Sequence, residues 1–219
     1  MRNFCYILSS FALGGMISCA SVKPMHWQVN SISAVAGHPV TVVGSPKVVK
    51  TEDGATAVAF DGVEDGLLLD VNPILGAEEF TIEVVFKPAD AWPANFEQRF
   101  LHIQDPANPN RRILMELRLN NQKQWYPDFF MRTDSASLTL IDSTKTHPVN
   151  QWAIMTLVYK DRQMRGYVNG NLELAGQITY LPIPATAKTS LGTRMDQRSW
   201  FNGVIKSVTF TPKAVVPEK

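Results

Sequence analysis

Apolar and polar side chains alternate along most of this chain with the two-residue period of an extended strand. In FTIEVVFKP, the positions that share the apolar face are Phe80, Ile82, Val84 and Phe86. In RILMELRLN, the corresponding positions are Ile113, Met115, Leu117 and Leu119. This pattern predicts strands that turn one face to a core and the other to polar surroundings. Helical periodicity is nearly missing from the sequence, so the chain is predicted to be all-β, either a sandwich or a barrel.

Further strands are predicted from short apolar segments that are separated by turn residues. They are TAVAFDG, GLLLDV, RFLHIQ, DFFMR, SLTLID, WAIMTLVYK, RGYV, NLEL and FNGVIKSVTFTP. Residues 152–159 lack polar alternation, which predicts a central strand buried on both faces, with Trp152 in the core. Asn169-Gly170 separates RGYV from NLEL, and both residues tolerate the positive φ of a type I′ turn. We therefore predict a two-residue hairpin there.

Residues 1–20 are predicted to be a signal peptide. Arg2 gives a short positive start, and the apolar run FCYILSSFALGGMI is too short to span a bilayer comfortably. Two cleavage sites compete: SCA suits a general signal peptidase, while MISC resembles a bacterial lipobox that would lipidate Cys19. The remainder, residues 21–219, has a length that is ordinary for a single all-β domain.

Charge and cysteine content narrow the partners and the compartment. The sequence has 21 basic and 20 acidic side chains, and loss of Arg2 with the leader makes them equal. Such a balance predicts no nucleic-acid partner, and membrane contact only through a lipid anchor at Cys19. Both cysteines, Cys5 and Cys19, lie in the leader, so the domain has no disulfide. We expect an exported protein that is periplasmic, anchored in the outer membrane or secreted.

Six motifs in order resemble the laminin-G-like branch of the concanavalin A-like lectin and glucanase superfamily. They lie within AVAFDGVEDGLLLD, EFTIEVVFKP, QWAIMTLVYKDRQMRGYVNGNLELAG and SLGTRMDQRSWFNGVIKSVTFTPKAV. The resemblance implies a jelly-roll sandwich of two antiparallel sheets, with the N- and C-terminal strands adjacent. Members of the superfamily bind glycans, proteins or Ca²⁺, and some cleave polysaccharides. Fold alone does not decide among these functions.

Two departures from the family patterns bear on activity. The glucanase branch carries a Glu-x-Asp-x-Glu strand, and this sequence has no such triplet, so it lacks that pair of catalytic carboxylates. Near the end of the chain, Lys206 and Ser207 stand where the laminin-G-like pattern often has an acidic pair.

The first candidate site is a polar sheet face. If the neighbouring strands share one sheet, alternation brings together Glu83, His102, Gln104, Glu116, Arg118 and Tyr167. Arginine can bind a carboxylate through two hydrogen bonds, histidine can act as a base near neutral pH, and tyrosine can protonate a leaving oxygen. The alternative is that Glu83, Glu116 and Arg118 form ion pairs across strands on a solvated face. We favour ion pairing or simple binding over lyase chemistry.

Two further candidate sites lie in predicted loops. Aromatic rings that could stack on sugars are Trp92, Trp125, Tyr126 and Trp200. Carboxylates that could bind Ca²⁺ are Asp61, Glu64, Asp65, Asp70 and Asp196, of which Asp61, Asp65 and Asp196 are the metal candidates considered. Their spacing matches no EF-hand loop, and Asp-Gly is more often a plain turn. The four histidines show no metalloprotease spacing, and the sequence has no serine elbow or phosphate loop. Apart from calcium, no cofactor is expected.

Two functional classes remain open. The sequence favours a noncatalytic exported module that binds carbohydrate or a surface glycoconjugate, through His102, Glu116, Arg118, Tyr167, Trp125 or Trp200. The alternative is a lyase or glycoside hydrolase that acts on the concave sheet face.

The mature protein is expected to begin at Cys19 or Ser21, because the leader ends in two overlapping cleavage motifs. Intact mass spectrometry of the protein recovered from a membrane fraction measures this directly. A mature form that keeps residues 1–18 would contradict the prediction.

Overall fold

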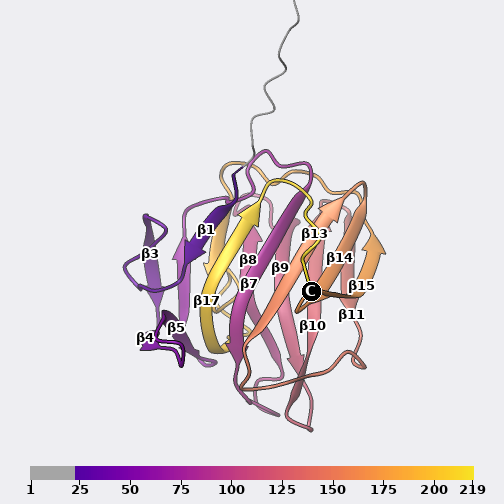
Figure 1. Cartoon of the computed structure of the whole chain (residues 1–219). Coiled ribbons are helices and arrows are strands. Elements are labelled where there is room, and N and C mark those ends of the chain that lie inside the picture. The colour runs from indigo at the N-terminus through magenta and orange to yellow at the C-terminus, as the bar shows by residue number, and fades with distance from the viewer. Residues whose placement is uncertain (1–22) are drawn as a thin grey trace, which may run out of the picture.

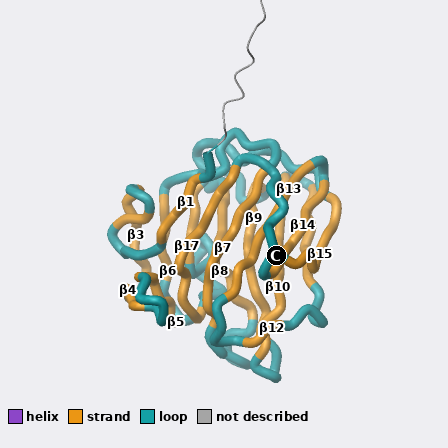
Figure 2. Tube along the Cα trace, viewed as in Figure 1, coloured by secondary structure: helices purple, strands orange, loops and turns teal. Residues whose placement is uncertain are grey.

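Two antiparallel sheets lie face to face in the structure, a computed structural model that describes residues 23–219. Figure 1 shows one sheet in front, with β17 and β7 at its centre, and the other sheet behind it. Loops and turns join the strands at both ends of the sandwich, as Figure 2 shows. The predicted leader and Cys19 lie outside the described residues.

The front sheet has eight strands. Its order is β15 (Asn171–Gln177), β14 (Gln163–Val168), β13 (Ala153–Lys160), β7 (Phe80–Pro88), β17 (Asn202–Thr211), β5 (Thr56–Asp61) and β4 (Lys47–Lys50), and β1 (Met25–Gln28) also pairs with β17. The pairing of β1 with β17 confirms that the first and last strands are adjacent. All of these pairings are antiparallel, as the jelly-roll fold requires.

The back sheet has nine strands. Its order is β11 (Ala136–Ile141), β10 (Gln124–Thr133), β9 (Arg111–Leu119), β8 (Glu97–Gln104), β16 (Lys188–Leu191), β6 (Gly66–Leu69), β3 (His38–Val43) and β2 (Ala34–Val35), and β12 (His147–Pro148) pairs with β10.

The part of the chain described here has no helix long and apolar enough to cross a membrane.

The core lies between the sheets, where the alternation predicted it. The four apolar positions of β7 are fully buried, and those of β9 are at most 1% exposed. Phe86 on β7 stacks on Phe100 of β8 with ring centroids 4.6 Å apart, which joins the two sheets. The face-to-face packing of apolar side chains is the main source of stability in such a sandwich.

The central strand predicted at residues 152–159 is observed as β13, Ala153–Lys160, but two side chains of the predicted segment are not fully buried. Ile154 is 37% exposed and Trp152 is half-buried, because both lie on the outer face of the front sheet. The prediction that Trp152 belongs to the core was therefore wrong. Because nearly all residues of this run are apolar, the sequence does not show where the strand begins or which side chains face outward.

The Asn169-Gly170 hairpin is confirmed between β14 and β15. Asn169 has φ of 48° and Gly170 has φ of 77°, as a type I′ turn demands. The Asn169 side chain also accepts a hydrogen bond from the Ile154 backbone N–H at 2.9 Å, which attaches the turn to β13. A Cβ on Gly170 would lie 2.3 Å from the Glu218 carbonyl oxygen, so space as well as φ restricts this position to glycine.

Replacing Gly170 with valine should lower the free energy of unfolding by roughly 1–3 kcal/mol, because a β-branched residue is strained at positive φ. Urea denaturation measures the loss. Gly170→Asn is the matched control, since asparagine adds the same Cβ but tolerates positive φ, and it should cost less than valine. Equal midpoints for the wild type and Gly170→Val would contradict the turn.

Candidate functional site

Three of the predicted site residues meet on the outer face of the back sheet. His102 comes from β8, and Glu116 and Arg118 come from β9. A bulge in β8 between Arg99 and Leu101 allows Phe100 and Leu101 both to face the core, so that Arg99 and His102 both point outward. The predicted clustering of His102, Glu116 and Arg118 on one face is therefore what the structure shows.

Glu116 and Arg118 belong to a network of alternating charges, here called the charge network, which consists of Glu97, Arg99, Glu116, Arg118 and Asp128. Arg99 Nε lies 2.7 Å from Glu116 Oε2, and Arg118 Nε donates to Asp128 Oδ2 at 2.8 Å. Glu97 pairs with both arginines. The side chains of Glu116 and Asp128 are 4% and 1% exposed, so the face is not the solvated one that was expected.

The charge network has two guanidinium groups and three carboxyl groups, and burial decides which carboxyl group keeps a proton. Burial, followed by the neighbouring Asp128 carboxylate, raises the pKa of Glu116 to about 7. Burial also raises the pKa of Asp128, against the opposing effect of Arg118. Against its own partial burial, the two arginines lower the pKa of Glu97. Glu116 is thus the carboxyl group that exchanges a proton near neutral pH.

A loop of residues 192–200 covers the network. The Met195 backbone N–H donates to His102 Nδ1 at 2.9 Å, and the Arg99 backbone N–H donates to the Ser199 carbonyl at 2.9 Å. The His102 ring is fully buried, and burial followed by the positive charge of Arg194 holds its pKa well below the usual range. Since Nδ1 accepts a hydrogen bond, the neutral ring carries its proton on Nε2. His102 is positioned to hold the loop in place, and it is closed off from a large ligand.

Tyr167 does not join these residues. It lies on β14 in the front sheet, whereas His102, Glu116 and Arg118 lie in the back sheet. The sequence pattern gave the correct face for Tyr167 relative to Val168 in its own strand, but it assigned the strand to the wrong sheet. The shared cleft predicted for a phenol, an imidazole and an Arg118 guanidinium therefore does not exist.

Trp125 also differs from its prediction. It lies within β10 rather than in a loop, and its side chain is fully buried in the core. Its ring packs edge-on against Phe86 with centroids 5.3 Å apart. A ligand on the surface cannot reach this indole, so Trp125 is a core residue.

Trp92 and Trp200 do lie in loops, and they line one hollow at an end of the sandwich. This rim hollow has a volume of about 610 Å³ and is lined by Gly62, Val63, Ala91, Trp92, Ala94, Asn95, Ser199 and Trp200. The Asn95 side-chain amide donates to the carbonyl oxygens of Gly62 at 2.9 Å and Trp200 at 2.7 Å, which ties the three loops together. The lining has two indoles, one amide and one hydroxyl group, and no charged side chain.

The rim hollow lies next to the aromatic core and is surrounded by exposed apolar side chains. Phe201, next to Trp200, is fully buried and lies against Phe60, Phe86 and Phe100. Val63, Trp92 and Phe96 around the hollow are 68%, 43% and 46% exposed. Exposed aromatic and aliphatic groups in a preformed hollow are typical of a ligand-binding surface.

The carboxylates considered for calcium have other partners. Asp61 Oδ1 accepts backbone N–H groups from residues 63–65 at 2.8–3.2 Å, and Asp65 accepts those of Ser45 and Asp61. Asp196 pairs with Arg194 and Arg198. Within residues 23–219, no three His, Cys, Asp or Glu side chains gather in a metal-binding arrangement. These aspartates organise turns and a loop.

Two antiparallel sheets packed face to face, with the first and last strands adjacent, define a jelly-roll sandwich. The profile of the concanavalin A-like lectin/glucanases superfamily matches residues 61–219, and the chain belongs to this superfamily. A sequence search of curated proteins finds no match.

Several solved structures share the fold. Domain 4 of AbnA, a GH43 extracellular arabinanase from Geobacillus stearothermophilus in complex with arabinotriose, is 15% identical with a TM-score of 0.63, over 87% of this chain and 92% of that one. The binding domain of botulinum neurotoxin DC in complex with SialylT is 13% identical with a TM-score of 0.61, over 88% of this chain and 48% of that one. A heptameric SAP-like pentraxin from Limulus polyphemus is 13% identical with a TM-score of 0.59, over 73% of this chain and 76% of that one. At these identities the likeness shows the fold alone.

The raised pKa of Glu116 predicts a dependence of stability on pH. Between about pH 4.5 and about pH 7, the folded state keeps the Glu116 proton that the unfolded chain has released. The folded state binds more protons in this range, so the free energy of unfolding falls as pH rises. Relative to the wild type, Glu116→Gln should gain on the order of 2 kcal/mol between about pH 5 and about pH 8 in urea denaturation.

Glu97→Gln is the matched control within the charge network. Because the pKa of Glu97 is lowered, its contribution is lost only as pH falls through the acid range, and its replacement should leave the fall between pH 5 and pH 8 in place. Parallel pH profiles for the wild type and Glu116→Gln would show that Glu116 does not hold a proton in the folded state.

Proposed function

We propose that this protein is an exported, noncatalytic module that binds neutral carbohydrate at the rim hollow. The observation that carries the proposal is the pair of indoles, the exposed Trp92 and the half-buried Trp200, that line a hollow with no charged side chain. Indole faces pack against the C–H faces of sugar rings, while Asn95 Oδ1 can accept a hydrogen bond from a sugar hydroxyl group and the Ser199 hydroxyl can donate one.

A solved structure with the same fold also supports carbohydrate as the ligand class. The arabinanase domain, which this chain matches over 92% of its length, was solved in complex with arabinotriose. The rim hollow adds what the fold alone cannot supply, which is a specific set of groups on this chain. Its volume falls within the range of about 300–1,000 Å³ for small-ligand pockets.

The rival function, cleavage of polysaccharides on the outer face of the back sheet, has one observation in its favour. Glu116 pairs across strands with Asp128, and its pKa of about 7 suits a general acid. However, a glycosidase needs both carboxyl groups beside the substrate, and these two side chains are almost fully buried beneath arginines. Binding at the rim therefore ranks above catalysis at the charge network.

Trp200→Ala and Trp92→Ala should each weaken binding by about tenfold or more, since truncated aromatic anchors dominate such interfaces. The measurement is a glycan array of neutral and acidic polysaccharides, followed by calorimetry with the oligosaccharide that binds. Tyr167→Phe is the matched control, because this aromatic side chain lies in the front sheet away from the hollow, and it should bind normally.

An activity screen on the same polysaccharides separates the two functions. The binding module releases no reducing ends and no unsaturated products, with or without Glu116. Turnover that is lost in Glu116→Gln but kept in Trp200→Ala would overturn the proposal and establish the enzyme.

A further inference from the structure

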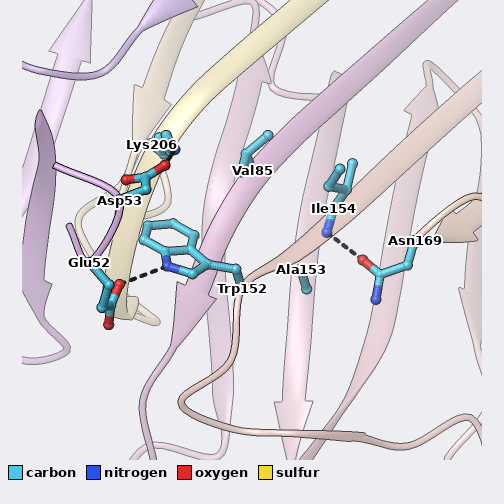
Figure 3. A pocket seen from close by; sticks show the side chains of 8 residues that line it. All are labelled: Glu52, Asp53, Val85, Trp152, Ala153, Ile154, Asn169 and Lys206. Atoms are coloured by element: carbon cyan, nitrogen blue, oxygen red, sulfur yellow. Dashed lines mark hydrogen bonds and ion pairs between the residues drawn. The ribbon is translucent and has the colours of Figure 1, made fainter. Parts of the chain in front are cut away.

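Trp152 lines a second hollow, on the outer face of the front sheet, that shares no residue with the rim hollow. It has a volume of about 630 Å³ and is lined by Glu52, Asp53, Val85, Trp152, Ala153, Ile154, Asn169 and Lys206. Figure 3 shows the Trp152 ring lying across the strands, with Val85, Ala153 and Ile154 to one side of it and the 51–55 turn to the other. We call this the sheet hollow.

The Trp152 ring is fixed in place by a polar frame. Its Nε1–H donates to Glu52 Oε2 at 3.0 Å, and the ammonium groups of Lys87 and Lys206 lie over the ring, 5.6 Å and 5.8 Å from its centroid. Lys87 in turn pairs with Glu52, and Lys206 pairs with Asp53. The ring therefore has a set orientation before any ligand arrives, which lowers the entropic cost of binding.

The charges of the frame decide the class of ligand. Two carboxylates balance two ammonium groups, so the sheet hollow has no net charge with which to attract an acidic or a basic polymer. Yet these groups offer hydrogen-bond acceptors and donors around one aromatic face, and Val85 and Ile154 extend that face as an apolar floor. Alternating apolar and hydroxyl-bearing surface is the chemistry of a neutral sugar ring.

The sheet hollow also adjoins another hollow, which argues for a chain of sugars over a single sugar residue. A hollow of about 540 Å³ shares Ile154 and Asn169 with it and is bounded beyond them by Gly170 and residues 215–219. The Asn169 side chain stands where the two meet, with its Oδ1 already accepting from the Ile154 N–H. Its Nδ2 is the donor left to face a ligand.

We propose that the sheet hollow is a second binding site, which takes a neutral oligosaccharide stacked on Trp152 and extended over Ile154 toward Asn169. The site is independent of the rim hollow. With both sites occupied, one domain can hold two segments of a polysaccharide, and this raises its avidity for a polymer above its affinity for a short oligosaccharide.

The test uses the full domain with Trp200→Ala, so that the rim hollow is disabled. The probes are arabinotriose and cellotetraose, and the observable is the indole N–H region of a ¹H–¹⁵N spectrum. Trp152→Phe assigns the Trp152 signal among the four tryptophans that remain after Trp200→Ala. We expect the Trp152 signal to shift with at least one probe, and the affinity to fall about tenfold or more in Trp152→Ala. Raising the salt concentration should change the affinity by less than about twofold, because the ligand is neutral.

Two variants keep the outcome clear if Trp152→Ala is unstable. Asn169→Asp keeps an acceptor for the Ile154 N–H and removes the proposed donor, and should weaken binding while the thermal midpoint remains measurable. Trp152→Phe keeps an aromatic face and should retain part of the affinity. A Trp152 signal that stays fixed at saturating probe would overturn the sheet site, whatever the rim hollow does. A shift that persists in Trp200→Ala supports it even if the rim proposal fails.

Discussion

The stacking of Phe86 on Phe100 joins the two sheets, and the position of Trp200 at the rim hollow depends on this contact. Phe86 belongs to the front sheet and Phe100 to the back sheet, and Phe201 packs against both rings. Because Phe201 is fixed in this aromatic core, the preceding residue, Trp200, is held at the rim with little freedom. Close-packed interiors transmit such constraints, since neighbouring groups have no space in which to relax.

The faces of individual strands could be predicted from the sequence, but the assignment of strands to sheets could not. Alternation correctly placed Glu116 and Arg118 on the outer face of β9. It also correctly placed the four apolar residues of β7 on the core face of that strand. It gave no information about which strands pair over long distances, so Tyr167 was combined with His102 although they lie in different sheets. Pairing of that kind depends on the whole chain and leaves no local pattern.

The tryptophans show the same limit. Trp125 follows a polar turn in the sequence and was taken for a loop residue, whereas Trp152 begins an apolar run and was taken for the core. In the structure Trp125 is buried in the core, and Trp152 lies half-buried on the outer face of the front sheet. Each lies at or next to the start of a strand, where too few alternating residues surround it to predict its face. Trp200 was placed correctly in a loop, since proline, asparagine and glycine do mark the ends of this sandwich.

Only part of the charge network could be predicted from the sequence. Glu97, Arg99 and Asp128 join it through strand pairing and a bulge, and neither can be predicted from the sequence pattern.

The position of β17 has a consequence for how the chain reaches this state. β17 lies beside β7 along its length and beside β5 and β1 on its other edge, so the middle of the front sheet is made of segments from opposite ends of the chain. During synthesis, β1, β5 and β7 emerge long before their common partner and must wait with unpaired edges. Contacts of such high sequence separation form slowly and expose strand edges to other chains in the meantime. A protein of this topology depends on being kept apart from its neighbours until its last strand arrives.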